Sequence, residues 1–215
     1  MNDLYLKGNS KQGLTGATLG FFIGFAAVAL YGSTAALFKN SFSGVSPILL
    51  ALLVAAPSLS GSLLRIPFAA WVDTTGGRKP FIVLLVLSII GMFGLYVVMA
   101  FFRQNLSEYY WVLFILALLS GCGIATFSVG VSQASYWFPQ DKQGSALGIY
   151  AGVGNIAPGI FMIIVPNIAI PLWGLSGSYL AWLIFLVIGT IIYIFIGQNA
   201  WYFQLMNKGI KKDEA

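Results

Sequence analysis

The stretch VSPILLALLVAAPSLSGSLLRIPFAAW, residues 45–71, decides the fold of this chain. It is long enough to cross a bilayer as a helix, which takes about 20 apolar residues, and its one charge is Arg65. A charged side chain at such depth costs about 2.5–3.5 kcal/mol on insertion scales. Membrane helices that keep an arginine face it toward protein or a water-filled cavity, often to hold an anion. The stretch therefore predicts a membrane protein with an internal positive charge.

The composition of the whole chain supports the same class. Of its 215 residues, 59% are hydrophobic and only 8% are charged, against about 25% charged in a soluble domain. We therefore expect an all-α integral membrane protein with six transmembrane helices, at residues 14–38, 45–71, 81–102, 109–138, 144–170 and 179–197. Two runs of three helices, each ending in a featureless apolar helix, predict the 3+3 inverted repeat of transporter halves.

The positive charges predict how the chain faces the membrane. With the N-terminus inside, only Lys39 and Arg103 lie on the outer side, and eight basic residues lie on the inner side: Lys7, Lys11, Arg78, Lys79, Lys142, Lys208, Lys211 and Lys212. This positive-inside bias predicts that both termini are cytoplasmic. We expect an N-terminal segment at 1–13, a transmembrane domain at 14–202 and a C-terminal tail at 203–215, in a prokaryotic plasma membrane.

Arg65 is the first candidate for binding a substrate. It precedes Trp71 by six residues, so it lies roughly 9–12 Å from the inner boundary at about 1.5 Å per residue. One interpretation is an arginine that snorkels to the inner headgroups. The other is a fixed charge lining a central cavity, where the planar guanidinium suits an oxyanion bound through two hydrogen bonds.

A face of small residues runs along the predicted helix at 144–170. Its members, at spacings of 4, 4, 3 and 4, are Gly144, Gly148, Gly152, Asn155 and Gly159. Such spacing places them on one side of a helix, and the doubled G-x-x-x-G pattern indicates close helix packing. Packing does not explain Asn155, whose amide needs a partner that a bound anion or a neighbouring helix would supply.

Polar residues also occur in the predicted helix at 109–138 and in the loop after residue 71. Ser128 and Ser132 share one helix face, and their hydroxyls either donate to an anion or bond their own backbone. The loop contains Asp73, Gly77 and Arg78. Its simplest interpretation is a topogenic basic loop with a tight glycine turn.

Two motifs resemble a known family. The run RIPFAAWVDTTGGRKP, residues 65–80, resembles the loop signature of the major facilitator superfamily, in which an acidic residue precedes a glycine turn and a basic pair. The run AGVGN, residues 151–155, is similar to the helix 5 signature A-G-x-G-N of the nitrate/nitrite porter family. WFPQDKQGSALG, residues 137–148, is similar to the run that precedes that signature. The resemblance covers all six predicted helices.

The resemblance implies a nitrate or nitrite porter and assigns roles to particular residues. In the family an arginine on helix 2 binds the anion, and Arg65 matches it in position. Asn155 matches the signature asparagine beside the pathway, where Gly154 accompanies the other glycines of that helix. Asp73 matches the acidic residue that helps lock the inner gate against the other half of the transporter, so Gly77 and Arg78 belong to a gating loop.

This sequence departs from the family pattern at two positions and in its length. Thr74 stands where a basic residue usually follows the acidic one, and Pro158 stands where a small flexible residue is expected. The family has twelve helices, and six are predicted here. We therefore expect a second six-helix half, either a separate chain or another copy of this one, with a truncated remnant as the third possibility.

The expected function is transport of nitrate or nitrite by alternating access between two halves. No Asp, Glu or His lies within the predicted helices, and anion exchange needs no side-chain proton carrier there. The alternatives are a porter of another small anion and a non-transporting membrane subunit. The sequence shows no nucleophile–base pair and no metal-ligand cluster, so neither an enzyme nor a cofactor is expected, and the basic charge is not interpreted as nucleic-acid binding.

Overall fold

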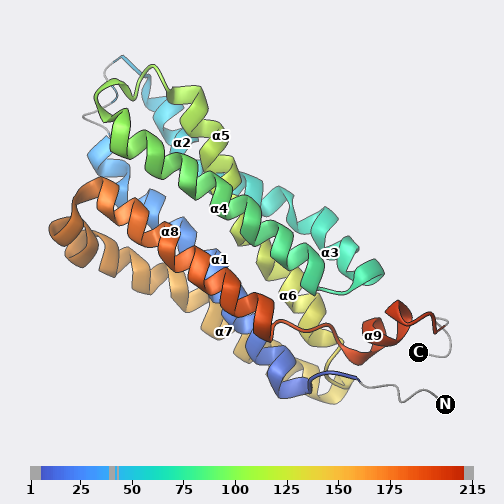
Figure 1. Ribbon diagram of the computed structural model, residues 1–215. Helices are drawn as coiled ribbons and strands as arrows, with labels where there is room; N and C mark the ends of the chain where they lie inside the picture. Colours follow the sequence, from blue (N-terminus) through green and yellow to red (C-terminus); the bar gives the residue numbers. More distant parts are fainter. Residues whose placement is uncertain (1–5, 39–41, 43, 211–215) are drawn as a thin grey trace.

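A computed structural model describes residues 6–38, 42 and 44–210 of the chain (Figure 1). The basic residues Lys39, Lys211 and Lys212 lie outside the described residues. The helical elements are α1 Ser10–Phe38, α2 Pro47–Leu63, α3 Arg65–Thr75, α4 Arg78–Phe101, η1 Arg103–Asn105, α5 Tyr110–Ser120, η2 Gly121–Ala125, α6 Thr126–Ser135, α7 Gln140–Ile164, η3 Val165–Ala169, α8 Ile170–Ile196 and α9 Trp201–Asn207. Of these, η1 and η2 are 3₁₀ helices and η3 is a π-helix.

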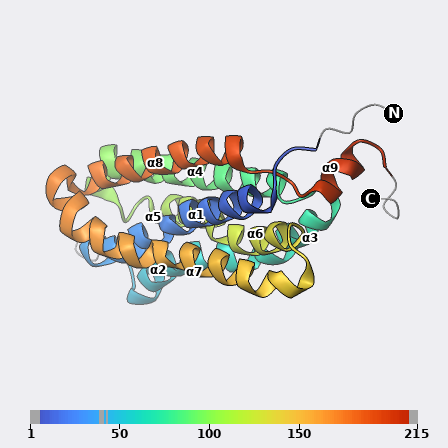
Figure 2. The same ribbon diagram turned by 90° about the horizontal axis from the view of Figure 1, so that it is seen from below.

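The long helices lie side by side in one bundle, with α1 between its layers (Figure 2). α1 packs against α6, α7 and α8, while α4 packs against α5 and α8. The two ends of the described chain lie at the same end of the bundle as α9 (Figure 1). Whether that end faces the cytoplasm stays a prediction from the basic residues.

Four stretches of the described chain are long and apolar enough to span a membrane by length and composition. They are Pro47–Thr75, Arg78–Phe101, Tyr110–Ser135 and Gln140–Ile196. The last stretch contains both α7 and α8, which run in opposite directions (Figure 1). An all-helical chain with several apolar spans is therefore confirmed, whereas the count of six spans and the inverted repeat stay predictions.

The helix expected at residues 109–138 is interrupted in its middle. α5 ends at Ser120, five residues of tighter 3₁₀ turn follow as η2, and α6 continues from there. Neighbouring helices supply donors to carbonyls in this region. The Ser88 hydroxyl of α4 donates to Ser120 O at 2.6 Å, and the Ser60 hydroxyl of α2 donates to Leu118 O at 2.6 Å. Such partners matter because backbone groups left unpaired in lipid cost several kcal/mol each.

Two glycines of η2 let other helices approach its backbone closely. A Cβ added to Gly121 would collide with the backbone of Pro57 in α2. A Cβ added to Gly123 would lie 2.6 Å from the carbonyl oxygen of Gly24 in α1, and the reverse substitution meets Gly123 O at the same distance. Small residues at helix contacts are the usual means of association in membranes, where burial in lipid supplies little driving force.

The helix expected at residues 45–71 is divided into α2 and α3, which meet at Leu64. Pro67 lies in the first turn of α3, and its missing N–H weakens helix continuity across that point. The loop expected at 72–80 is much shorter, because α3 continues to Thr75 and α4 begins at Arg78. Two residues remain between them, and the first, Gly76, has a φ of +80° that favours glycine.

The turn between α7 and α8 also differs from the expected loop at residues 171–178. η3 and the first residues of α8 continue the helical backbone of α7, and the break between the two helices lies within α8 at Gly174, with φ +66° and ψ −175°. The gap expected between the helices predicted at residues 144–170 and 179–197 is therefore helical for most of its residues. Their apolar neighbours favour helical hydrogen bonding over an open loop, and glycine supplies the single left-handed conformation.

We expect Gly123→Val to destabilise the bundle, because its Cβ would lie against the backbone of α1 rather than against a movable side chain. Overpacking of this kind costs about 1–3 kcal/mol or more. Thermal unfolding of the purified protein in detergent, followed by size-exclusion chromatography, measures the loss. Gly159→Val is the matched control, since a Cβ there meets no atom within 4 Å. Equal loss in both variants would contradict the close approach at η2.

Candidate functional site

Arg65 is the first residue of α3, immediately after the break that ends α2. Its Cζ lies 5.0 Å from the centre of the Phe127 ring on α6, a cation–π distance. Its Nε is buried and has no hydrogen-bond partner in the described part of the chain. The side chain is half-buried. The guanidinium is thus held against protein, and its buried Nε–H lacks the acceptor that such a donor normally has.

An aromatic cluster behind Arg65 connects it to α1 and α7. Phe127 lies 5.2 Å from Phe21 of α1 and 6.2 Å from Tyr150 of α7, measured between ring centres. The buried Tyr150 hydroxyl donates to Phe127 O at 2.9 Å. The ring under Arg65 is therefore fixed by side-chain and backbone contacts together. The sequence interpretation missed Phe127 and Tyr150, because an aromatic residue in an apolar helix gives no signal that it contacts a charge.

Ser128 and Ser132 both lie half-buried on α6. The Ser128 hydroxyl lies 3.1 Å from Arg65 O and 3.1 Å from Ala125 O. The structure therefore brings Ser128 and Arg65 together through the backbone of Arg65. That contact positions the start of α3, and it favours the backbone interpretation of Ser128 that the sequence left open. Ser132 lies one turn further along the same helix.

The face of α7 that contains Asn155 is open in this chain. Asn155 is exposed, and its Nδ2 donates to Ala151 O of the same helix at 2.8 Å. A Cβ added to Gly144, Gly148 or Gly152 would meet nothing within 4 Å. Gly154 differs, because a Cβ there would collide with the Phe21 ring of α1. Of these four predicted packing glycines, only Gly154 lies where an added Cβ would meet another helix of the described chain.

The residues of the predicted gating loop are held by other elements. Asp73 is exposed and accepts a hydrogen bond from the Tyr136 hydroxyl at 3.3 Å. Tyr136 lies just beyond the candidate span that ends at Ser135. Partial burial, and then the negative charge of Asp73, raise the pKa of Tyr136. The phenol therefore stays a neutral donor at neutral pH.

Arg78 is held by the end of α8 and the residues that follow it. Its Nη2 donates to Ile194 O at 2.7 Å, and its backbone N–H donates to Asn199 Oδ1 at 2.9 Å. Gly77 is buried, and a Cβ there would lie 2.6 Å from Cβ of Gln133. The turn between α3 and α4 is thereby packed against α6 and tied to the residues that follow α8.

Gln133 of α6 joins these elements and is fully buried. Its Nε2 donates to Gln198 O at 2.8 Å, and its Oε1 accepts from the Tyr193 hydroxyl at 3.0 Å. The Tyr193 ring in turn stacks on Phe81 of α4 with ring centres 4.3 Å apart. A buried amide whose two ends are satisfied fixes the relative positions of α4, α6 and α8.

Comparison with known proteins places this fold in a family. A profile of the Major Facilitator Superfamily matches residues 17–206, which covers most of the bundle. The chain belongs to the major facilitator superfamily. The chain is similar to the nitrate/nitrite transporter NarU of Salmonella typhimurium, with 39% identity over 115 residues. The match covers 54% of this chain and 24% of NarU.

Two further relatives match most of this chain. The probable nitrate/nitrite antiporter NarK1 of Thermus thermophilus is 30% identical over 190 residues, covering 86% of this chain and 40% of the relative. The probable nitrate transporter NarT of Staphylococcus epidermidis is 30% identical over 194 residues, covering 89% and 47%. The chain spans less than half the length of these relatives. The resemblance to nitrate/nitrite porters is confirmed, and these relatives are bacterial membrane transporters rather than enzymes.

We expect Gln133→Leu to destabilise this superfamily member by about 1–3 kcal/mol, since it leaves the buried Tyr193 hydroxyl and the Gln198 carbonyl without their partner. Thermal unfolding in detergent measures the change. Gln140→Leu is the matched control, because Gln140 is exposed at the start of α7. If the two variants unfold at the same temperature, Gln133 does not hold the helices together.

Proposed function

We propose that this chain forms one half of a nitrate/nitrite transporter and that Arg65 binds the anion. The observation that carries the proposal is the buried Arg65 Nε, which has no partner in the described residues although the charge sits in an apolar span. The similarity to NarU, NarK1 and NarT supports nitrate or nitrite as the substrate class. A planar guanidinium matches a planar oxyanion through two parallel hydrogen bonds.

The open side of the bundle supports the need for a second half. Gly144, Gly148 and Gly152 present smooth backbone to open space, and Asn155 lies on the same side of α7. Close backbone packing is the usual use of such a face in a membrane. We infer that a second six-helix body covers it and that the anion passes between the two bodies by alternating access.

In this proposal the remaining predicted residues act around the pathway. Ser132 and Asn155 line the cavity beside Arg65, while Ser128 holds the backbone of Arg65 in place. Asp73, Gly77 and Arg78 form the gating loop at the end of the bundle that carries α9. Gly77 packs against Gln133, and the Arg78 backbone N–H donates to Asn199. Movement of the gating loop therefore requires these contacts to change.

Arg65→Lys tests the anion site. We expect nitrate uptake by cells that supply the complete transporter to fall at least about tenfold, because an ammonium loses the second of two parallel hydrogen bonds. Uptake of labelled nitrate or nitrite, normalised to the amount of protein in the membrane, measures the effect. Arg103→Lys makes the same substitution at an exposed position and should leave uptake unchanged. Near-normal uptake and affinity in Arg65→Lys would overturn the site.

Gly148→Leu and Gly154→Leu separate the two sides of α7. We expect Gly154→Leu to unfold the chain, because the new side chain collides with Phe21. Gly148→Leu should leave the thermal stability of the isolated chain unchanged, since the position faces open space, yet abolish uptake by blocking the second body. Normal uptake in folded Gly148→Leu protein would show that nothing packs closely on this face.

A further inference from the structure

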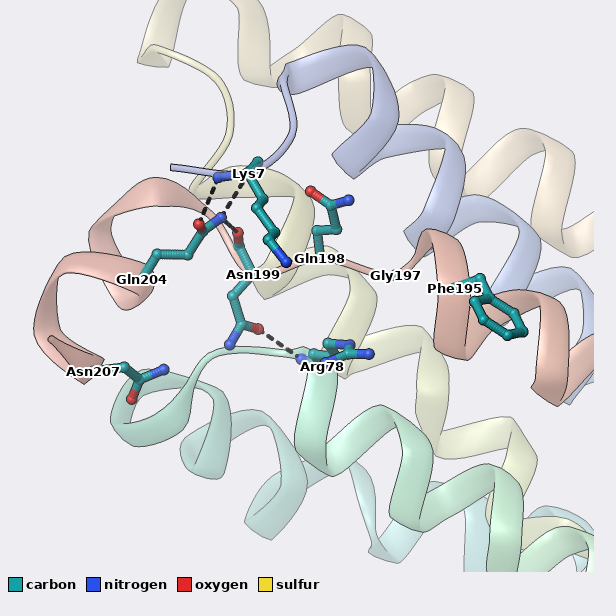
Figure 3. Close-up of a pocket in the computed structure, with 8 residues that line it drawn as sticks. All are labelled: Lys7, Arg78, Phe195, Gly197, Gln198, Asn199, Gln204 and Asn207. Atoms are coloured by element: carbon teal, nitrogen blue, oxygen red, sulfur yellow. Dashed lines mark hydrogen bonds between the residues drawn. The ribbon is translucent and has the colours of Figure 1, made fainter. Parts of the chain in front are cut away.

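The end of the bundle at which the described chain begins and ends contains a fixed polar framework. The Lys7 backbone N–H donates to Gln204 Oε1 at 2.8 Å, and Gln204 Nε2 lies 2.8 Å from both Lys7 O and Asn199 O. Asn199 Nδ2 donates to Thr75 O at 3.1 Å. The side-chain amides of Gln204 and Asn199 are therefore held in place by protein partners (Figure 3).

A pocket of about 360 Å³ lies within this framework. It is lined by Lys7, Arg78, Phe195, Gly197, Gln198, Asn199, Gln204 and Asn207. Two of these residues are cations and four are amides, and none of the described lining residues is acidic. Lys7 comes from the N-terminal segment and Arg78 from the start of α4, and Figure 3 shows the Lys7 side chain extending toward Arg78. The pocket is thus positively charged.

The two cations keep hydrogen-bond donors free for a ligand. Arg78 uses Nη2 for Ile194 O, and a guanidinium has five N–H donors. The Lys7 ammonium has no acceptor within the part of the chain that the structure describes, and both residues are exposed. Arginine and lysine together are the groups that proteins use for phosphate oxyanions.

An apolar stripe leads to the same pocket along α8. Its residues are Ile184, Ile188, Ile191 and Phe195, which follow at helical spacing on one face and are 49–78% exposed. Phe195, the most exposed of them, also lines the pocket. A neighbouring pocket shares Phe195 and Gln198 and adds Lys11. A soluble anion would not contact the apolar stripe, whereas the acyl chain of a lipid would pack along it.

We propose that this pocket binds the phosphate group of an anionic phospholipid whose acyl chains lie on the α8 stripe. Arg78 and Lys7 hold the phosphate oxygens, and Lys11 faces the remainder of the headgroup. Basic pockets beside membrane helices are suited to anionic headgroups. Bound lipid would join the N-terminal segment, α4 and α8, three parts of the chain that are distant in sequence. The site is separate from Arg65 and from the open face of α7.

Native mass spectrometry of the full chain tests the proposal. The protein is released from detergent after incubation with equal amounts of phosphatidylglycerol and phosphatidylcholine. We expect phosphatidylglycerol to be retained in preference. Arg78→Gln and Lys7→Gln should each lower its retention about tenfold, the effect of one lost charge-assisted hydrogen bond. Lys142→Gln removes an exposed charge on α7 and should leave retention unchanged.

Three outcomes would overturn the proposal. They are equal retention of the two lipids, the same loss in Lys142→Gln as in Lys7→Gln, and displacement of phosphatidylglycerol by equimolar inorganic phosphate. The last outcome would assign the pocket to a free oxyanion instead. If Arg78→Gln fails to fold because it loses its bond to Ile194 O, Lys7→Gln carries the test, since the Lys7 ammonium donates no hydrogen bond to the described residues. No flux is measured, so a failure here is distinct from a failure of the transport proposal.

Discussion

The close approach of α1, α2 and α4 to η2 is the constraint on which the rest of the structure depends. In a bilayer, apolar surface gains little by leaving lipid, so helices associate through backbone contact and hydrogen bonds. Gly121 and Gly123 supply the contact with α2 and α1. Ser88 and Ser60 donate to carbonyls of α5 where the helix tightens. The centre of the bundle is therefore set by small residues and hydroxyls rather than by large side chains.

The position of Arg65 follows from that centre. α2 is held against η2 at Pro57, and the helix breaks at Leu64, about one turn beyond Gly61, before α3 begins at Arg65. The break lets the guanidinium lie over Phe127, whose ring is fixed by Phe21 and Tyr150. If α2 and α3 formed one straight helix, Arg65 would not be directed onto this aromatic ring in the same way. The local irregularity thus gives the charge a defined direction in the proposed cavity.

The sequence predicted the membrane class, the family and the charge within the apolar stretch at residues 45–71, because each depends on composition or on a local motif. Helix interruptions were not predictable in the same way. The run around Gly121 is as apolar as its flanks, so nothing local distinguishes a 3₁₀ turn from α-helix. The role of Gln133 was also hidden, since its partners Tyr193 and Gln198 are 60 and 65 residues away in the chain. The small-residue face of α7 was predicted from spacing, but spacing does not say whether the covering helix belongs to this bundle.

The bond between Lys7 and Gln204 has a consequence for the order of folding. The two residues are separated by 197 positions, and every long helix of the chain lies between them. Closing so long a loop early would cost conformational entropy with no neighbouring contacts to offset it. The bond between Lys7 and Gln204 therefore forms late, after the helices between them have packed together.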